Sequence, residues 1–278
     1  MMKAKIGVML PIRPETDIDN EFKKIADLEL DCCQVSVWKM HLYNDELAEQ
    51  LKAASAKYNI EIVALWAGWS GPCEWNFTHG PSTLGLVPPA YRGVRLAELK
   101  IASDFAEKLG VTNVVTHAGF MPENPDDNNF VGTVAALRDL CKYMEKKGQT
   151  FLFETGQETP VTMLRAIEAI GYENVGINFD TANLIMYGKA NTVDALEVFG
   201  KYVRNTHCKD GLYPTCGNEL GLEVPMGEGK ANFPAVVAKL NELGYTGPYI
   251  IEREIKGDKQ VADIKLGKDL LTSIFANY

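Results

Sequence analysis

The sequence predicts a single α/β domain over residues 1–278, in which eight parallel strands alternate with helices and close into a (β/α)8 barrel, or TIM barrel. Short β-branched apolar runs alternate with longer segments that have apolar residues at helical spacing, and eight such units can be counted. Strict alternation favours a parallel sheet, and a chain of this length suits one barrel. The first run is not followed by a Gly-x-Gly-x-x-Gly pattern, which argues against an open dinucleotide-binding sheet.

The first half of the chain supplies four of these units. We expect strands at 5–10, 33–38, 61–66 and 113–117. We expect helices at about 19–30, 44–58, 90–110 and 129–147. Asn44 is a residue type that caps helix N-termini, and Gly110 stands where helices commonly end in a left-handed residue. The irregular stretch 67–89 is rich in Gly, Pro, Trp and Asn, and because loops of that length are usually functional it predicts a lid or pocket wall.

The second half supplies the other four units. We expect strands at 150–154, 175–180, 203–207 and 248–252. Thr159 and Pro160 have the residue types of an N-cap and a first-turn proline, and the short helix that they begin should end at Gly171. Asn232 is expected to cap a helix that Gly244 ends, and a last helix should cover about 258–275. The loop 208–231 is again long and rich in glycine.

Composition excludes several classes of function. The formal net charge is -9 and the pI about 5.1, so the chain lacks the basic surface that nucleic acid requires, and a small-molecule substrate is favoured. No apolar stretch has the length of a membrane span or the form of a signal peptide, so we expect a cytoplasmic protein that does not contact a membrane. The six cysteines form no CxxC pair and are expected to be reduced thiols.

Four of the expected strands end in a side chain that binds hard metal ions: Glu154, Asp180, His207 and Glu252. Any one of them alone is more often a helix cap or a solvated group, but barrel active sites are built from several strand ends. If all four point into the barrel, their carboxylates repel one another unless a cation compensates them. The sequence therefore predicts one divalent metal ion. Three carboxylates and one imidazole favour Mn²⁺, Mg²⁺ or Co²⁺, while the ligand types alone do not exclude Zn²⁺.

The segments that carry these residues resemble the strand ends of the xylose-isomerase-like sugar phosphate isomerase/epimerase superfamily. The matching segments are Phe153-Glu154, Asn178 to Leu184, Thr206 to Asp210 and Ile250 to Glu254. The superfamily includes ketose 3-epimerases, hydroxypyruvate isomerase and inosose dehydratase, and the likeness covers essentially the whole chain. It implies that the four residues bind one divalent cation. It also implies that Glu154 and Glu252 are the catalytic acid/base pair. Asn183 and Tyr213 stand at about the places where the 3-epimerases have a His and an Arg.

The resemblance implies a divalent-metal-dependent isomerase or epimerase that acts on a sugar or sugar phosphate, with manganese as the preferred metal. Chelation of a ketose acidifies its α-proton, and the metal stabilises the enediolate. Dehydration of a cyclic polyol ketone is the first alternative, since it needs only one glutamate at the carbon. A sugar-binding barrel without turnover is another. An abasic-site endonuclease of the related barrel type fits poorly, because such enzymes use several metals with many His ligands and this acidic chain has four His.

Other residues near the expected strand ends are candidates for substrate binding: His117, Gln157, Asn183 and Asp210. Asp210 is also a candidate to orient the imidazole of His207. Lys209 is expected either to contact a phosphate or to be solvated, and Glu254 is the rival of Glu252 for the metal.

Two further features of the sequence have more than one interpretation. The side chains of Trp38, Trp66, Trp69 and Trp75 suit an apolar wall against a sugar ring, but also core packing or the contact surface of a homo-oligomer. The segment Gly227 to Lys230 is interpreted as a turn in preference to a phosphate cradle.

Overall fold

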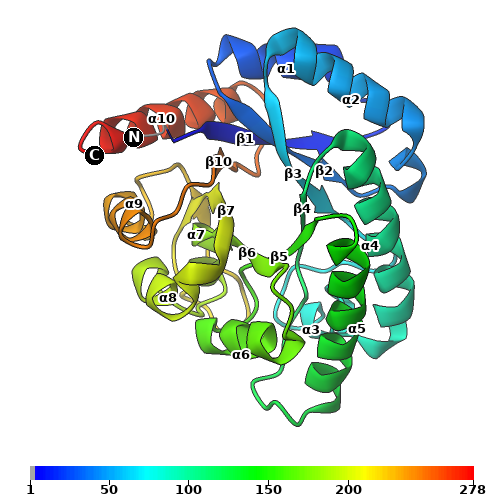
Figure 1. The fold of residues 1–278 in the computed structure, drawn as a ribbon. Coiled ribbons are helices and arrows are strands. Elements are labelled where there is room, and N and C mark those ends of the chain that lie inside the picture. The colour runs from blue at the N-terminus through cyan, green and yellow to red at the C-terminus, as the bar shows by residue number, and fades with distance from the viewer. Residues whose placement is uncertain (1–3) are drawn as a thin grey trace.

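The computed structural model describes residues 4–278, in which the parallel strands close into a barrel (Figure 1). The order around the barrel is β1-β10-β7-β6-β5-β4-β3-β2, so the last strand closes against the first. The barrel strands are β1 (Ile6–Ile12), β2 (Cys32–Val37), β3 (Glu61–Ala67), β4 (Asn113–Thr116), β5 (Thr150–Glu154), β6 (Val175–Asp180), β7 (Val203–Cys208) and β10 (Tyr249–Ile251). A small antiparallel pair, β8 (Asp210–Gly211) and β9 (Glu223–Val224), lies outside the barrel. The predicted (β/α)8 fold is confirmed.

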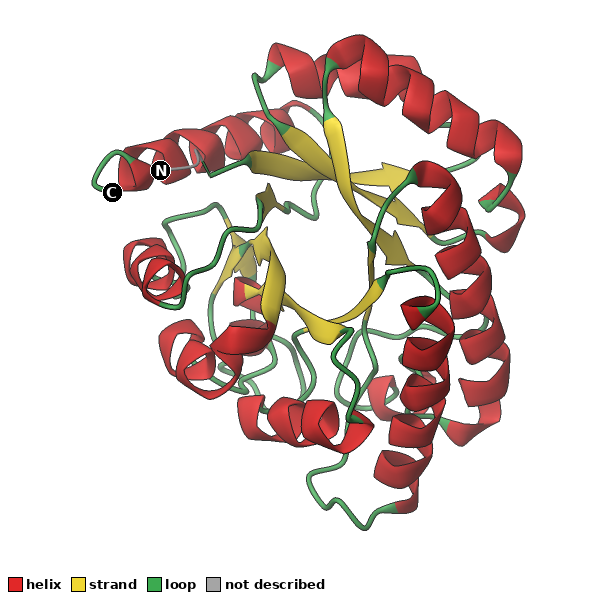
Figure 2. Cartoon of the chain, in the orientation of Figure 1, coloured by secondary structure: helices red, strands yellow, loops and turns green. Residues whose placement is uncertain are grey.

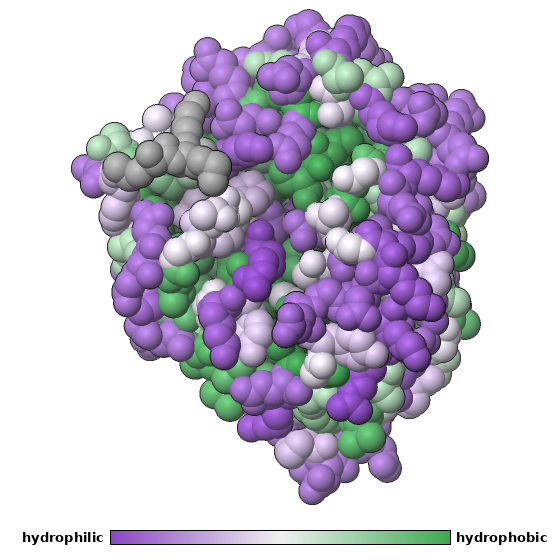
Figure 3. Space-filling model, viewed as in Figure 1, coloured by the Kyte–Doolittle hydropathy of each residue, from purple (hydrophilic) through white to green (hydrophobic). Residues whose placement is uncertain are grey.

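Helices form the outer layer around the strands (Figure 2). The longer ones are α1 (Ile18–Asp27), α2 (Asp45–Tyr58), α4 (Pro89–Leu109), α5 (Asn128–Glu145), α6 (Pro160–Ile170), α8 (Thr192–Phe199), α9 (Phe233–Glu242) and α10 (Asp258–Phe275). Short turns of helix occur at η1 (Met40–Leu42), α3 (Gly80–Thr83), α7 (Thr181–Met186) and η2 (Gly200–Tyr202). Within residues 4–278, none of the helices combines the length and the apolar character needed to cross a membrane. The face seen in Figure 3 is largely hydrophilic, with smaller hydrophobic areas between the polar side chains.

Most of the predicted helix ends are confirmed. The side chains of Asn44 and Thr159 accept hydrogen bonds from backbone N–H groups in the first turns of α2 and α6. Gly110 and Gly171 are left-handed at the ends of α4 and α6. The prediction for Asn232 is wrong, since it makes no side-chain cap hydrogen bond and has a φ of 54°. An N-cap side chain reaches the first turn from extended backbone, and this left-handed conformation does not provide it.

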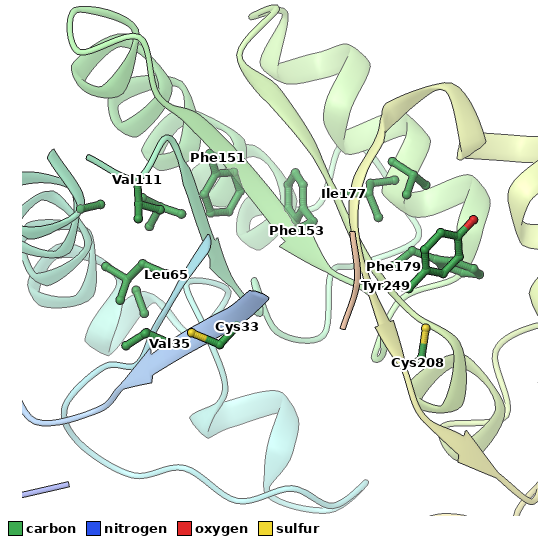
Figure 4. Close-up of a cluster of buried hydrophobic side chains, with 14 of the residues drawn as sticks. Cys33, Val35, Leu65, Val111, Phe151, Phe153, Ile177, Phe179, Cys208 and Tyr249 are labelled. Atoms are coloured by element: carbon green, nitrogen blue, oxygen red, sulfur yellow. The ribbon is translucent and has the colours of Figure 1, made fainter. Parts of the chain in front are cut away.

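Alternation along the strands divides the side chains between two environments. Outward-facing residues such as Phe151 and Phe153 on β5, and Ile177 and Phe179 on β6, pack in the main core between strands and helices (Figure 4). Their neighbours in sequence therefore face the barrel interior. Toward β3, β4 and β5 the interior is apolar, with Ala64, Trp66, Val115 and Leu152 in one buried cluster. Toward β2, β6 and β7 it is polar, with buried Gln34, Asn178 and Asn205.

The long loop after β3 is fixed against α4 by a buried arginine. The guanidinium of Arg95 donates hydrogen bonds to the carbonyl oxygens of Ser70, Pro72, Thr83 and Gly85. One guanidinium thereby ties together four backbone carbonyl groups of this segment. The loop 67–89 is thus an ordered wall of the barrel mouth.

Gly85 is expected to be essential for the position of this wall. It has a φ of +65°, and an added Cβ would overlap the backbone carbonyl of Ala118, the residue after His117. Gly110 has a similar φ of +75° but open space around it. Gly110→Ala should therefore lower the free energy of unfolding by about 1 kcal/mol, from left-handed strain alone. Gly85→Ala should lower it by about 3 kcal/mol or more, because backbone must also move. Urea unfolding of both variants measures these free energies. Equal losses in the two variants would contradict the prediction for Gly85.

Candidate metal centre

The structure brings the four predicted ligands together at the C-terminal end of the barrel. Glu154 and Asp180 are the last residues of β5 and β6, His207 lies in β7, and Glu252 follows β10 by one residue. Asp180 and His207 are partners across the β6–β7 ladder, so they share the inward face. Each of the four residues offers one ligand atom, and these atoms all lie within 4.8 Å of one another. The side chains are buried, with only Glu252 reaching 13% exposure.

His207 stands at the centre of the carboxylates. Its Nδ1 atom lies 2.9 Å from Glu154 Oε1, 3.2 Å from Glu252 Oε2 and 3.7 Å from Asp180 Oδ2. Its other ring nitrogen, Nε2, lies 3.0 Å from the side-chain oxygen of Gln34 and faces away from the acids. Nδ1 is therefore the nitrogen that is available to a cation.

Lys209 is a fixed positive charge beside the centre, which corrects both interpretations made from the sequence. The residue is 2% exposed, so it is not solvated. Its ammonium lies 2.9 Å from Glu252 Oε2, 3.2 Å from Asp180 Oδ2 and 3.3 Å from Glu254 Oε2. A lysine without these partners would be expensive to bury as a charge, and its three acidic neighbours leave no free face for a phosphate.

The acids draw positive charge into this site. Burial alone lowers the pKa of His207, but Glu154 and Glu252 outweigh it and hold that pKa well above its ordinary value. Burial likewise works against the charged form of Glu252, yet Lys209 and His207 hold its pKa well below the usual range. Burial raises the pKa of Asp180. A buried site with more acids than bases is stabilised by a cation.

The chemistry of the donors fits one divalent metal ion. Three carboxylates and a neutral imidazole nitrogen supply oxygen-rich coordination of the kind that Mn²⁺, Mg²⁺ and Co²⁺ take. Asp180 Oδ2 is buried and makes no hydrogen bond within residues 4–278, although the Lys209 ammonium lies 3.2 Å from it. Glu254, the rival named from the sequence, has a side chain that is 59% exposed and lies outside this group. Glu254 instead forms an ion pair with the ammonium of Lys209.

Comparison with known proteins identifies the family. Residues 22–273 match the family described as xylose isomerase-like TIM barrel. The chain belongs to this xylose isomerase-like family. A xylose isomerase domain protein from Planctomyces limnophilus is 34% identical, with 98% of this chain and 97% of that chain covered and a TM-score of 0.91.

Two more distant solved structures share the fold of this xylose isomerase-like protein. A D-tagatose 3-epimerase-like protein is 22% identical, with 98% of this chain and 97% of that chain covered and a TM-score of 0.73. A xylose isomerase-like TIM barrel protein from Mycobacterium smegmatis, in complex with magnesium, is 17% identical. The coverage is 98% of this chain and 96% of that chain, and the TM-score is 0.72.

Two of the residues named as substrate ligands adjoin Glu154 in this xylose isomerase-like barrel. His117 Nε2 lies 3.6 Å from Glu154 Oε2, and its Nδ1 has no hydrogen-bond partner within residues 4–278. Burial lowers the pKa of His117, so its ring is neutral near pH 7. The side-chain amide of Asn183 donates a hydrogen bond of 3.4 Å to Glu154 Oε1. The backbone N–H of Asn183 donates one of 2.8 Å to Asp180 Oδ1. Both side chains therefore border the centre.

Three further buried side chains carry polar atoms without partners among the described residues. They are both side-chain atoms of Gln157, both carboxylate oxygens of Glu158, and the hydroxyl of Tyr187. Burial raises the pKa of Glu158 to about 8, so this acid is largely protonated at neutral pH. The sequence named Gln157 as a candidate and left Glu158 open, but it missed Tyr187. The signal was available, because Tyr187 stands four residues after Asn183 and one helical turn brings such residues to one face.

Asp210 does not orient His207, so that prediction is wrong. Its carboxylate accepts hydrogen bonds from the backbone N–H groups of Gly211, Gly227, Gly229 and Ala231. These four donors tie the loop after β7 to the barrel and occupy both oxygens. The segment 227–230 is thus a turn around a protein carboxylate, and the N–H groups that a phosphate would need are already used.

The tryptophans gather on the apolar side of the centre. Trp38 stacks on Trp66 with ring centroids 4.9 Å apart, and the Trp69 ring lies 5.2 Å from that of Trp38. The Trp66 indole N–H donates a hydrogen bond to Glu154 Oε2. Trp75 lies 5.0 Å from the ring of His117 and is partly exposed. The sequence left an apolar wall, core packing and an oligomer contact open for these tryptophans, and it did not predict the hydrogen bond from Trp66 to Glu154.

Proposed function

We propose that this protein is a divalent-metal-dependent isomerase or epimerase of a small sugar or sugar phosphate. The observation that carries the proposal is the convergence of Glu154, Asp180, His207 and Glu252 on one volume at the mouth of the barrel. Membership of the xylose isomerase-like family supports it, as do structural neighbours described as a D-tagatose 3-epimerase-like protein and as L-ribulose 3-epimerase.

Glu154 and Glu252 are proposed as the acid/base pair. They belong to strands that β6 and β7 separate in the barrel, so they reach the shared volume from different directions. A divalent ion held by the four residues supplies Lewis acidity toward a substrate carbonyl, which makes the neighbouring C–H group acidic. One glutamate then removes the α-proton and the other returns a proton from its own side, which inverts the carbon. Mn²⁺ is the proposed ion, with Mg²⁺, Co²⁺ and Zn²⁺ as alternatives.

The unpartnered polar groups around the centre are proposed as hydroxyl ligands. Gln157 and Tyr187 offer donors and acceptors, and the neutral acid of Glu158 adds an O–H donor. Buried polar groups without partners are costly, and a polyol would satisfy them. His117 and Asn183 complete the polar side, while Trp66 and Trp75 face the apolar side of a sugar.

Dehydration of a cyclic polyol ketone is a second candidate, favoured by Glu158. A carboxylic acid that keeps its proton near pH 7 suits protonation of a departing hydroxyl. In that reaction one glutamate removes the α-proton, the C–O bond at the β-carbon breaks, and water leaves. The enone product absorbs in the ultraviolet, which an epimer does not.

Solvent-exchange measurements test the proposal directly. The protein is incubated in D₂O with a panel of free and phosphorylated ketoses, with Mn²⁺ or after treatment with a chelator. We expect deuterium at the carbon next to the carbonyl only when the metal is present. Saturating Mn²⁺ should also raise Tm, since a ligand at 100 times its Kd stabilises the folded state by about 2.7 kcal/mol. Exchange that survives metal removal, or no exchange with any member of the panel, would overturn the proposed reaction.

A further inference from the structure

A chain of three buried amides lies below the candidate metal centre. The side-chain oxygen of Gln34 on β2 lies 3.0 Å from His207 Nε2 and 2.6 Å from the Asn205 amide nitrogen. The same amide nitrogen also donates to the side-chain oxygen of Asn178 on β6. All four side chains are fully buried. This row of hydrogen-bonded side chains therefore crosses the barrel interior from β2 to β7 and β6.

Irregular strand pairing accompanies these residues. The β2–β3 register shifts between Cys33 and Gln34, and the β6–β7 register shifts between Ile177 and Asn178. In the second case Arg204 has no partner, since Ile177 pairs with Val203 and Asn178 with Asn205. An extra residue in one strand re-aims the side chains that follow it, and such irregularities are common next to active sites. This shift sets Asn205 and His207 on the inward face.

We propose that Gln34 is a positioning residue that fixes the tautomer and the ring orientation of His207. A cation can bind Nδ1 only if that atom keeps its lone pair, so the neutral ring must carry its proton on Nε2. That proton needs an acceptor, and the oxygen of Gln34 is the atom in reach. Asn205 in turn donates to the same oxygen, which prevents the Gln34 amide from presenting its nitrogen to the ring.

The proposal deepens the proposed function, because it assigns a partner to one of its metal ligands. A hydrogen-bond acceptor behind a metal-binding imidazole orients the ring and makes the ligand nitrogen more basic. Here the acceptor is an uncharged amide in a site that already has an excess of carboxylates. An uncharged partner provides the hydrogen bond without a further negative charge below the metal.

Two substitutions at position 34 separate the hydrogen bond from packing. Gln34→Met keeps the length of the side chain and removes the acceptor, whereas Gln34→Glu keeps an acceptor oxygen. In isothermal titration calorimetry, Gln34→Met should bind Mn²⁺ about 10- to 100-fold more weakly than the wild type does. Gln34→Glu should show no loss of Mn²⁺ affinity, because the ring proton keeps its acceptor and the added charge is opposite to that of the ion.

Gln149→Met is the matched control, since Gln149 is also buried and hydrogen-bonded but pairs with Ser103 at the other end of β5. It should lose stability and leave Mn²⁺ affinity unchanged. The proposal would be overturned if Gln34→Met bound Mn²⁺ as tightly as the wild type. It would also be overturned if Gln149→Met lost as much Mn²⁺ affinity as Gln34→Met.

A measurement on the wild-type protein needs neither turnover nor a folded variant. Two-bond ¹H–¹⁵N correlation spectra report which ring nitrogen of His207 carries a proton. The sequence has only four His residues, so the spectra contain few signals. With saturating Mg²⁺ we expect a slowly exchanging proton on Nε2 and none on Nδ1, the nitrogen that faces the carboxylates. A ring without a proton on Nε2 would overturn the proposal. If the wild type binds Mg²⁺ but the ring has no proton on Nε2, only the role of Gln34 fails. If the wild type binds no metal, the proposed function fails and the role of Gln34 behind a metal ligand fails with it.

Discussion

Glu252→Gln is expected to lower α-proton exchange by at least about 10³-fold, because one substitution removes both a metal ligand and a proton carrier. Mn²⁺ affinity should fall in the same variant. The amide is nearly isosteric with the acid, so the barrel should keep its fold. Exchange into D₂O and titration with Mn²⁺ measure the two effects separately.

Glu254→Gln provides the comparison for this experiment. Glu254 is two residues away and contacts the same lysine, but its side chain is largely exposed and outside the group of four ligands. Exchange in Glu254→Gln should stay within about threefold of the wild type, as for an exposed ion pair. If Glu254→Gln rather than Glu252→Gln lost both exchange and Mn²⁺ binding, the ligand assignment at β10 would be wrong.

Glu158→Gln is expected to change how stability depends on pH. The pKa of Glu158 is raised to about 8 by burial, whereas an unfolded glutamate titrates near about 4.3. The folded state thus binds the proton more tightly than the unfolded state. Its stabilising contribution is complete below about pH 4 and is lost as pH rises through about 8, a change of a few kcal/mol. The Gln variant cannot ionise and should lack this loss.

Urea unfolding at pH 5, 7 and 9 measures the effect. The free energy of unfolding of the wild type should fall by a few kcal/mol more than that of Glu158→Gln between pH 5 and pH 9. Glu219→Gln, at an exposed position in the loop after β8, is the control and should follow the wild type. Parallel pH profiles for wild type and Glu158→Gln would show that the acid at position 158 ionises normally in the folded protein.

Residue periodicity predicted the fold well because it depends on local sequence. Apolar runs such as 150–154 and 175–180 matched β5 and β6 to the residue, and Asn44, Gly110 and Thr159 marked helix ends correctly. These features follow from side-chain alternation and from backbone groups within one turn of helix. The failure at Asn232 has the same origin, since its residue type suits a cap but its backbone conformation is set by the surrounding loop.

Partner assignments at the site were less reliable. Lys209 and Asp210 stand two and three residues after His207, and both were given roles that the structure corrects. Lys209 is buried among carboxylates from β6 and β10, and Asp210 holds four backbone N–H groups of a loop that returns beside it. Sequence adjacency says little about which way each side chain points at the irregular end of a strand. Loop return and burial decide which charge meets which partner.

The sequence by itself indicated four candidate metal-binding side chains at or beside the ends of four strands, and a closed parallel barrel was enough to predict that they meet. Only the tertiary structure decided which side chains contact these four residues from inside the barrel. Gln34 reaches His207 across 173 residues of chain, and this contact depends on barrel closure through β1 and β10 and on the shifted register of β7. Glu158 owes its raised pKa to burial that no short segment can create. Local sequence patterns specify which face of a strand a residue occupies, whereas the partner on that face is fixed by how the whole sheet curves and closes.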